Sequence, residues 1–154
     1  MIVAFLSAVE AWAPIAALRN SMLVYPLVNA GHILGVALLV GSLIPLDLRL
    51  AGLWRQVMLM PVWRMLSRTA VCGFLLALIT GLLLFATRAT EYVESTLFLT
   101  KLALILVAGL NAIWLARRFT ALLSPATAVV RPAAVASIIL WVGVLVLGRL
   151  VGYF

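Results

Sequence analysis

Long apolar segments alternate with short polar ones along most of this chain. The apolar segments cover about residues 22–45, 69–87, 97–116 and 132–151. Each is close to the roughly 20 residues that a helix needs to cross a bilayer. The polar stretches between them carry most of the charged residues, as loops outside the hydrocarbon do. The pattern predicts an all-α protein, a four-helix transmembrane bundle.

Residues 1–20 are also apolar, but Glu10 and Pro14 interrupt them and Arg19 and Asn20 close them. This predicts a short interfacial N-terminal segment of one or two helices, lying along the membrane surface instead of crossing it. The composition agrees with a membrane protein, because 67% of the 154 residues are hydrophobic and only 10% are charged. A soluble domain carries far more charge. We expect one integral membrane domain over residues 1–154.

The net charge of +7 does not indicate nucleic-acid binding, because the basic residues stand at the ends of apolar runs. One set lies in the loops after the first and third spans: Arg49, Arg55, Arg64, Arg68, Arg117, Arg118 and Arg131. A smaller set lies on the other side: Arg19, Arg88, Lys101 and Arg149. The positive-inside rule then places both termini outside the cytoplasm. Asp47, the one acidic residue among the inner arginines, is expected to pair with Arg64 or Arg68.

One face of the first span carries the chemistry. Residues 22–41 hold no charge, and Tyr25, Asn29 and His32 fall on one side at about 100° per residue. His32, the only histidine, lies about 15 Å along the helix, near the middle of the bilayer. Polar side chains at that depth are costly, so the face is expected to point into the bundle.

His32 has two interpretations. A neutral imidazole is a good ligand for haem iron or copper. Alternatively, His32 forms a hydrogen bond to a neighbouring helix through Asn111, Thr80 or a backbone carbonyl. Gly31 and Gly35 beside it would let either a flat macrocycle or a second helix approach the backbone closely.

Lys101, the only lysine, lies a few residues inside the third span. It would serve as the counter-charge of a carboxylate such as a haem propionate, act as a proton carrier, or extend to the lipid headgroups. A single histidine excludes a bis-histidine haem within one chain. Glu91 and Glu94 of the outer loop would bind a cation, pair with Arg88 and Arg19, or stand in solvent.

The residues 27–53, with Tyr25-Pro26 and residues 18–21 before them, resemble the first segment of a bacterial membrane family of unknown function. More distantly, the layout resembles the CopD copper-resistance membrane domains and the HemJ-type protoporphyrinogen oxidases. The shared features are an early histidine, an arginine before the next span, a Thr-Gly-Leu-Leu stretch and a Lys-Leu pair. Here these are His32, Arg49 or Arg68, residues 80–83, and Lys101-Leu102.

The resemblance implies a multi-pass protein of the bacterial inner membrane. From the HemJ type it implies haem b and functional importance for His32 and Lys101. The chain departs from the families' pattern at residues 36–39, where a tryptophan is usual, and at residues 98–100 before the lysine.

The leading expectation is therefore a haem b site for electron transfer or porphyrin oxidation. His32 would be the metal ligand, with Tyr25, Asn29 and Lys101 around it. One alternative is a CopD-like accessory protein for copper transport or resistance. The other is a non-catalytic membrane subunit or scaffold that assembles through Gly31 and Gly35. The expected partners are the lipid bilayer, a redox or periplasmic protein and a second copy of the chain.

Overall fold

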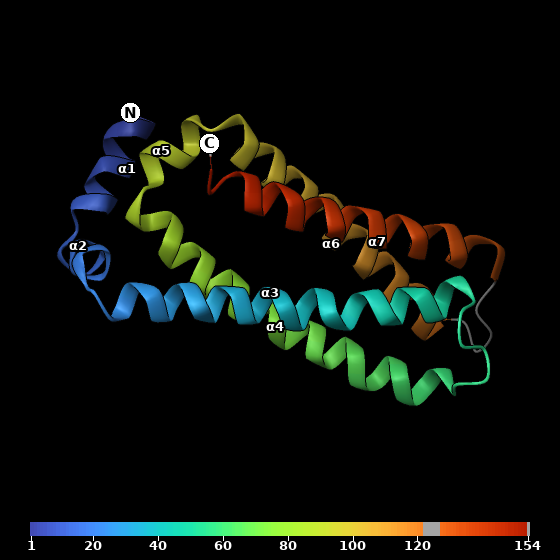
Figure 1. Cartoon of the computed structure of the whole chain (residues 1–154). Helices are drawn as coiled ribbons and strands as arrows, with labels where there is room; N and C mark the ends of the chain where they lie inside the picture. Colours follow the sequence, from blue (N-terminus) through green and yellow to red (C-terminus); the bar gives the residue numbers. More distant parts are fainter. Residues whose placement is uncertain (122–126, 154) are drawn as a thin grey trace.

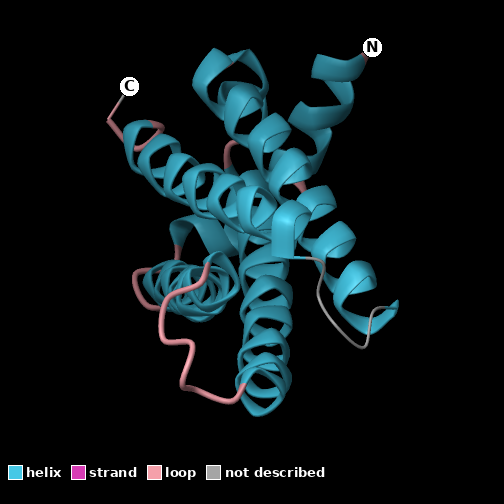
Figure 2. Cartoon of the chain, turned by 90° about the vertical axis from the view of Figure 1, so that its right-hand side faces the viewer, coloured by secondary structure: helices cyan, strands magenta, loops and turns pink. Residues whose placement is uncertain are grey.

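Long apolar runs fold as helices in a bilayer because the backbone there must satisfy its own hydrogen bonds. The computed structural model describes residues 1–121 and 127–153, and every regular element in these ranges is a helix. Figure 2 shows these helices joined by loops. The helices long and apolar enough to cross a membrane are α3 (Val24–Ala51), α4 (Leu59–Thr87), α6 (Thr96–Ala121) and α7 (Thr127–Leu150) (Figure 1). The predicted all-α fold with four spans is confirmed, and the chain is a multi-pass membrane protein.

The spans extend further than the hydropathy pattern predicts. Helix α3 continues through Pro45 to Ala51, and α4 begins at Leu59, so Arg64 and Arg68 are helical residues and not loop residues. Pro61 lies in the first turn of α4, where a proline costs no hydrogen bond. The 28 residues of α3 are about 42 Å long, more than the hydrocarbon thickness of about 30 Å. The apolar pattern therefore marks where the spans are but not where the helices end.

The bundle has two distinct ends, which we name by what they carry. The terminal end holds residues 1–20, 88–95 and 150–153, and the loop end holds the loop 52–58 between α3 and α4 (Figure 1). Within the described ranges, α4 packs on α3, α3 on α7 and α7 on α6, while the backbones of α4 and α6 do not touch. At the loop end, stacked rings of Trp63 and Phe119 join α4 and α6, with centroids 4.1 Å apart.

The core lies along α3 and α7. Its central cluster comprises Leu39, Val40, Leu43, Ala70, Ala108, Trp141 and Val144. A second cluster near the loop end comprises Leu46, Leu50, Leu115, Val130 and Ala134. Many large apolar side chains elsewhere on the spans are exposed, for example Leu106 and Ile139. A lipid bilayer is the environment that covers such a surface.

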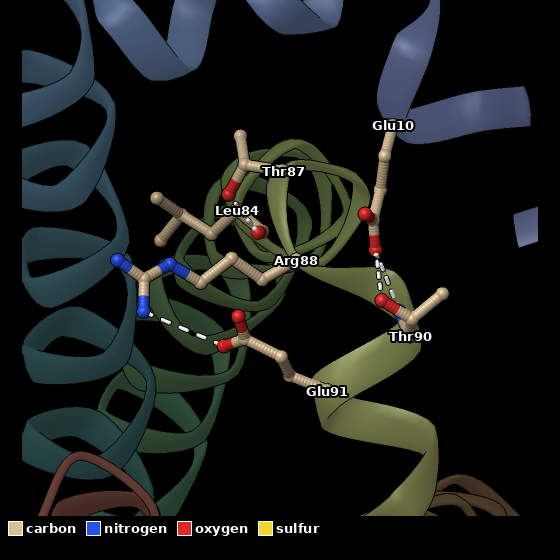
Figure 3. A network of polar contacts seen from close by, with 6 residues as sticks. All are labelled: Glu10, Leu84, Thr87, Arg88, Thr90 and Glu91. Carbon is tan, nitrogen blue, oxygen red and sulfur yellow. Dashed lines mark hydrogen bonds and ion pairs between the residues drawn. The ribbon is translucent and has the colours of Figure 1, made fainter. Parts of the chain in front are cut away.

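Two short helices precede the spans, α1 (Ile2–Ala11) and α2 (Ala13–Asn20), bent by 64° relative to each other. Helix α1 packs on α5 (Ala89–Glu94), and α2 packs on α4. The Glu10 carboxylate accepts hydrogen bonds from the backbone amide and the hydroxyl of Thr90, each at 2.7 Å (Figure 3). The short N-terminal helices are therefore present and attached to the terminal end. Their place in the membrane interface stays a prediction.

Candidate functional site

His32 points from α3 to α4. Its Nδ1 donates to the carbonyl oxygen of Ala77 at 2.9 Å, and the hydroxyl oxygen of Thr80 lies 3.3 Å from the same atom. A carbonyl oxygen only accepts, so Nδ1 carries the proton and, in the neutral ring, Nε2 keeps its lone pair. The hydrogen bond to a neighbouring helix is one of the predicted interpretations. It is also the arrangement that orients a metal-ligating histidine.

Thr80 and Gly81 shape the surface against which the His32 ring lies. The Thr80 hydroxyl donates to the Leu76 carbonyl at 2.6 Å, so its oxygen presents a lone pair to the imidazole. A Cβ on Gly81 would lie 3.0 Å from Cε1 of His32. The ring therefore occupies the space that a side chain at position 81 would need. Thr80 and Gly81, which belong to the Thr-Gly-Leu-Leu stretch of the family resemblance, thus form the surface that His32 contacts.

Gly31 and Gly35 also face α4. A Cβ on Gly35 would lie 2.5 Å from the backbone nitrogen of Ala77, and one on Gly31 would lie 3.3 Å from the methyl group of Thr80. The backbone of α4 thus fills the surface of Gly35, which leaves no room there for a macrocycle or for a second chain. Close helix approach was the second of the two expected uses of these glycines.

Lys101 lies on α6, half-buried, with its Nζ 5.9 Å from the centroid of the Phe98 ring. The end of its side chain lies beside Gly148 of α7. Its ammonium group also lies close enough to the His32 ring to interact with it electrostatically. The structure therefore brings the two residues singled out by the resemblance into one region. No salt bridge within the described part of the chain involves Lys101.

Tyr25 and Asn29 take no part in the hydrogen bonds that join His32 to α4. Asn29 is exposed. Tyr25 lies near Tyr92 of α5, whose pKa is raised chiefly by burial and then by Tyr25. Tyr92 also stacks with Phe98 at 4.9 Å between centroids, near Lys101. The three residues of the predicted face thus have different surroundings. His32 contacts α4, Tyr25 lies near α5, and Asn29 is exposed.

A second polar group lies between α3 and α7, and of its members only Asp47 was a candidate from the sequence. Asp47, Ser137 and Trp141 are 2%, 1% and 3% exposed. Among the residues that the structure describes, no hydrogen-bond partner reaches the Asp47 Oδ2, the Ser137 Oγ or the Trp141 Nε1. The predicted pairing of Asp47 with Arg64 or Arg68 is wrong, because α3 turns Asp47 toward Ser137 of α7. Ser137 and Trp141 are uncharged residues of an apolar run, so nothing in the sequence distinguished them.

Metal binding by a cluster of side chains finds no support in the described ranges. They contain no group of three or more histidine, cysteine, aspartate or glutamate side chains placed to hold an ion. Asn111, another expected partner of His32, instead donates to the Ala133 carbonyl at 3.0 Å. Glu91 pairs with Arg88 at 3.4 Å, both exposed.

Comparisons of this chain with protein-family models, with curated protein sequences and with solved structures find no significant match.

Proposed function

We propose that this membrane protein binds haem b through Nε2 of His32 and serves electron transfer or porphyrin oxidation. The observation that carries the proposal is the hydrogen bond from Nδ1 of His32 to the Ala77 carbonyl at 2.9 Å. That bond fixes the ring and the tautomer and leaves Nε2 as the free donor atom, as in histidines that ligate metals.

The neighbouring residues fit such a group in part. Lys101 supplies a positive charge in the region of His32 without a carboxylate partner of its own in the described structure, as a propionate would require. Gly35 is covered by α4, so the porphyrin would have to lie on the Nε2 side of the ring, away from Gly35. Bound haem b supplies one-electron chemistry at its iron. The chain contributes the ligand, its orientation and a compensating charge.

No specific observation favours either alternative, the copper accessory protein or the non-catalytic membrane subunit. Copper handling needs several ligands around one ion. The described ranges contain no group of three or more histidine, cysteine, aspartate or glutamate side chains placed to hold one. Assembly through Gly31 and Gly35 needs a free surface, but both glycines pack within the chain against α4. The haem proposal is therefore the one that uses the geometry of His32.

The test is the visible spectrum of the purified protein, oxidised and then reduced with dithionite, after expression with added haem precursor. We expect a Soret band that shifts on reduction and is lost in His32→Ala. His32→Gln is the matched variant, because its amide retains a donor for Ala77 but is a poor iron ligand. A wild-type protein without haem would refute the proposal, as would a Soret band unchanged in position and amount in both variants.

A further inference from the structure

A basic pocket lies at the loop end, where the loop 52–58 passes the start of α7. It is a partly open hollow of about 330 Å³, and three arginines line it: Arg49, Arg55 and Arg131. Leu50 and Val130 form an apolar part of the pocket wall beside the arginines. The arginines come from the last turn of α3, the loop and the first turns of α7, so only the folded chain brings them together.

The loop holds two of the guanidinium groups in place. Arg49 donates from Nε to the Val57 carbonyl at 3.0 Å and from Nη2 to the Arg55 carbonyl at 3.2 Å. Arg55 donates from Nε to the Gly52 carbonyl at 3.1 Å. An arginine that only extends to the lipid headgroups does not need hydrogen bonds to loop carbonyls, so these bonds indicate fixed positions for Arg49 and Arg55. The remaining N–H groups of both arginines are left for a ligand.

Gly52 lies beside both Arg55 and Arg131. Its φ of 113° lies in the left-handed region, which favours glycine. A Cβ there would lie 3.4 Å from Nη2 of Arg55 and 3.7 Å from Nε of Arg131. Trp54 in the same loop also has a positive φ, 50°, which is strained for a large side chain. The unusual backbone of the loop therefore lies close to Arg55 of the loop and to Arg131 of α7.

In the described part of the chain, no carboxylate lines the pocket to compensate these charges. The chain has four acidic residues, and three of them, Glu10, Glu91 and Glu94, belong to the terminal end. The fourth, Asp47, is buried between α3 and α7 and does not line the pocket. Converging guanidinium groups repel one another unless an anion lies between them. Their planar, forked donors match the oxygens of a phosphate.

We propose that this pocket binds a phosphate group through Arg49, Arg55 and Arg131. Two sources carry that chemistry, the headgroup of an anionic phospholipid and free inorganic phosphate. The position at the end of the spans, with Leu50 and Val130 beside the arginines, suits a headgroup whose acyl chains run along the helices.

The principal variant is Arg131→Gln, because Arg131 makes no hydrogen bond to the loop and its loss leaves the loop's own contacts intact. The matched control is Arg118→Gln. Arg118 carries the same charge at the same end of the bundle, but lies over the Trp114 ring, outside the pocket. Arg131→Lys keeps the charge without the forked donors and provides a second variant close to the native chain.

The experiment measures thermal unfolding in neutral detergent, with phosphatidylglycerol, phosphatidylcholine or inorganic phosphate added. We expect phosphatidylglycerol to stabilise the wild type and Arg118→Gln, and to bind Arg131→Gln at least roughly tenfold more weakly, as the loss of one charged hydrogen bond predicts. Arg131→Lys should fall between them. Equal stabilisation by inorganic phosphate would identify the free anion as the ligand, and stabilisation by phosphatidylglycerol alone would identify the headgroup.

The proposal is overturned if neither phosphatidylglycerol nor phosphate stabilises the wild type more than phosphatidylcholine does. It is also overturned if Arg131→Gln and Arg118→Gln lose the effect equally, since the arginines would then act only as general positive charge. Unfolding temperatures without added ligand show whether each variant is folded. None of these outcomes depends on haem, so the pocket is tested separately from His32.

Discussion

Gly35 of α3 and Gly73 of α4 face each other where the two helices approach closely. A Cβ on Gly35 would lie 2.9 Å from the carbonyl oxygen of Gly73, and a Cβ on Gly73 would lie 2.8 Å from that of Gly35. This reciprocal contact sets the distance between the two helices. It also brings Ala77, the hydrogen-bond acceptor of His32, against α3. The glycine crossing and the histidine site are therefore parts of one interface.

Gly35→Ala and Gly73→Ala should both destabilise the protein. The added methyl group meets backbone atoms that cannot move without separating the helices, so we expect a cost of about 1–3 kcal/mol. Gly41→Ala is the control, since a Cβ there meets nothing within 4 Å, and it should be neutral or stabilising by up to about 1 kcal/mol. Thermal unfolding in detergent, followed by tryptophan fluorescence, measures all three. Equal unfolding temperatures for Gly35→Ala and Gly41→Ala would contradict the crossing.

Asp47→Asn should preserve or increase stability. The Asp47 carboxyl is buried with one oxygen unpartnered, and a neutral amide of the same shape avoids the cost of placing charge there. We expect a gain of about 1–3 kcal/mol where the carboxyl is ionised in the folded protein, and little change otherwise. Ser137→Ala is the companion variant, because its hydroxyl is also unpartnered. A clear loss of stability in Asp47→Asn would show that the carboxylate holds an essential contact.

The attachment of the N-terminal helices should weaken in acid. The pKa of the Glu10 carboxyl is lowered, first by the Thr90 amide and then by the Thr90 hydroxyl, both of which donate to it. A lowered pKa means that the contact is complete at neutral pH and is lost as the pH falls through the range in which Glu10 protonates. Hydrogen exchange in residues 88–95, corrected for the intrinsic rate, should therefore rise on acidification.

Glu10→Gln should reproduce at pH 7 the faster exchange that the wild type shows in acid. Glu94→Gln removes an equal charge from α5 and provides the control, because Glu94 is exposed and is not a partner of Thr90. If both variants exchange at the wild-type rate, Glu10 does not hold α5. Figure 3 shows the carboxylate directed at Thr90, while the nearby Arg88–Glu91 pair is separate.

The orientation in the membrane can be tested with single cysteines. Cys72 is exposed on α4, so Cys72→Ala gives a clean background. From the positive-inside rule we expect Glu94→Cys at the terminal end to react with an impermeant maleimide in intact spheroplasts. Gln56→Cys at the loop end should react only after lysis. The reverse pattern would place the termini in the cytoplasm and overturn the expected topology.

Several features of the fold could be predicted because they follow from local periodicity. Apolar runs long enough to span a membrane predicted the four long helices. Glu10 and Pro14 indicated that the N-terminal segment forms shorter helices. Helix ends were predicted less well. Pro45 was expected to end the first span, but a proline inside a membrane helix is tolerated where neighbouring groups satisfy the freed carbonyl.

The candidate site was predictable only as a list of residues. His32 and Lys101 stand out because each is the only residue of its kind in the chain. Their partners depend on which helices touch, and the order α4–α3–α7–α6 is not encoded in hydropathy. Asn111 was an equally reasonable partner for His32 until the fold placed it against Ala133.

The sequence by itself determined that this protein is helical, crosses the membrane and concentrates positive charge at one end, because these properties depend on solvent preference residue by residue. Only the tertiary structure decided that Ala77 holds the His32 ring, that Asp47 faces Ser137 and that Arg131 joins Arg49 and Arg55. These contacts join residues far apart in the chain. Their distances are set by how closely small residues such as Gly35 and Gly73 let the helices approach.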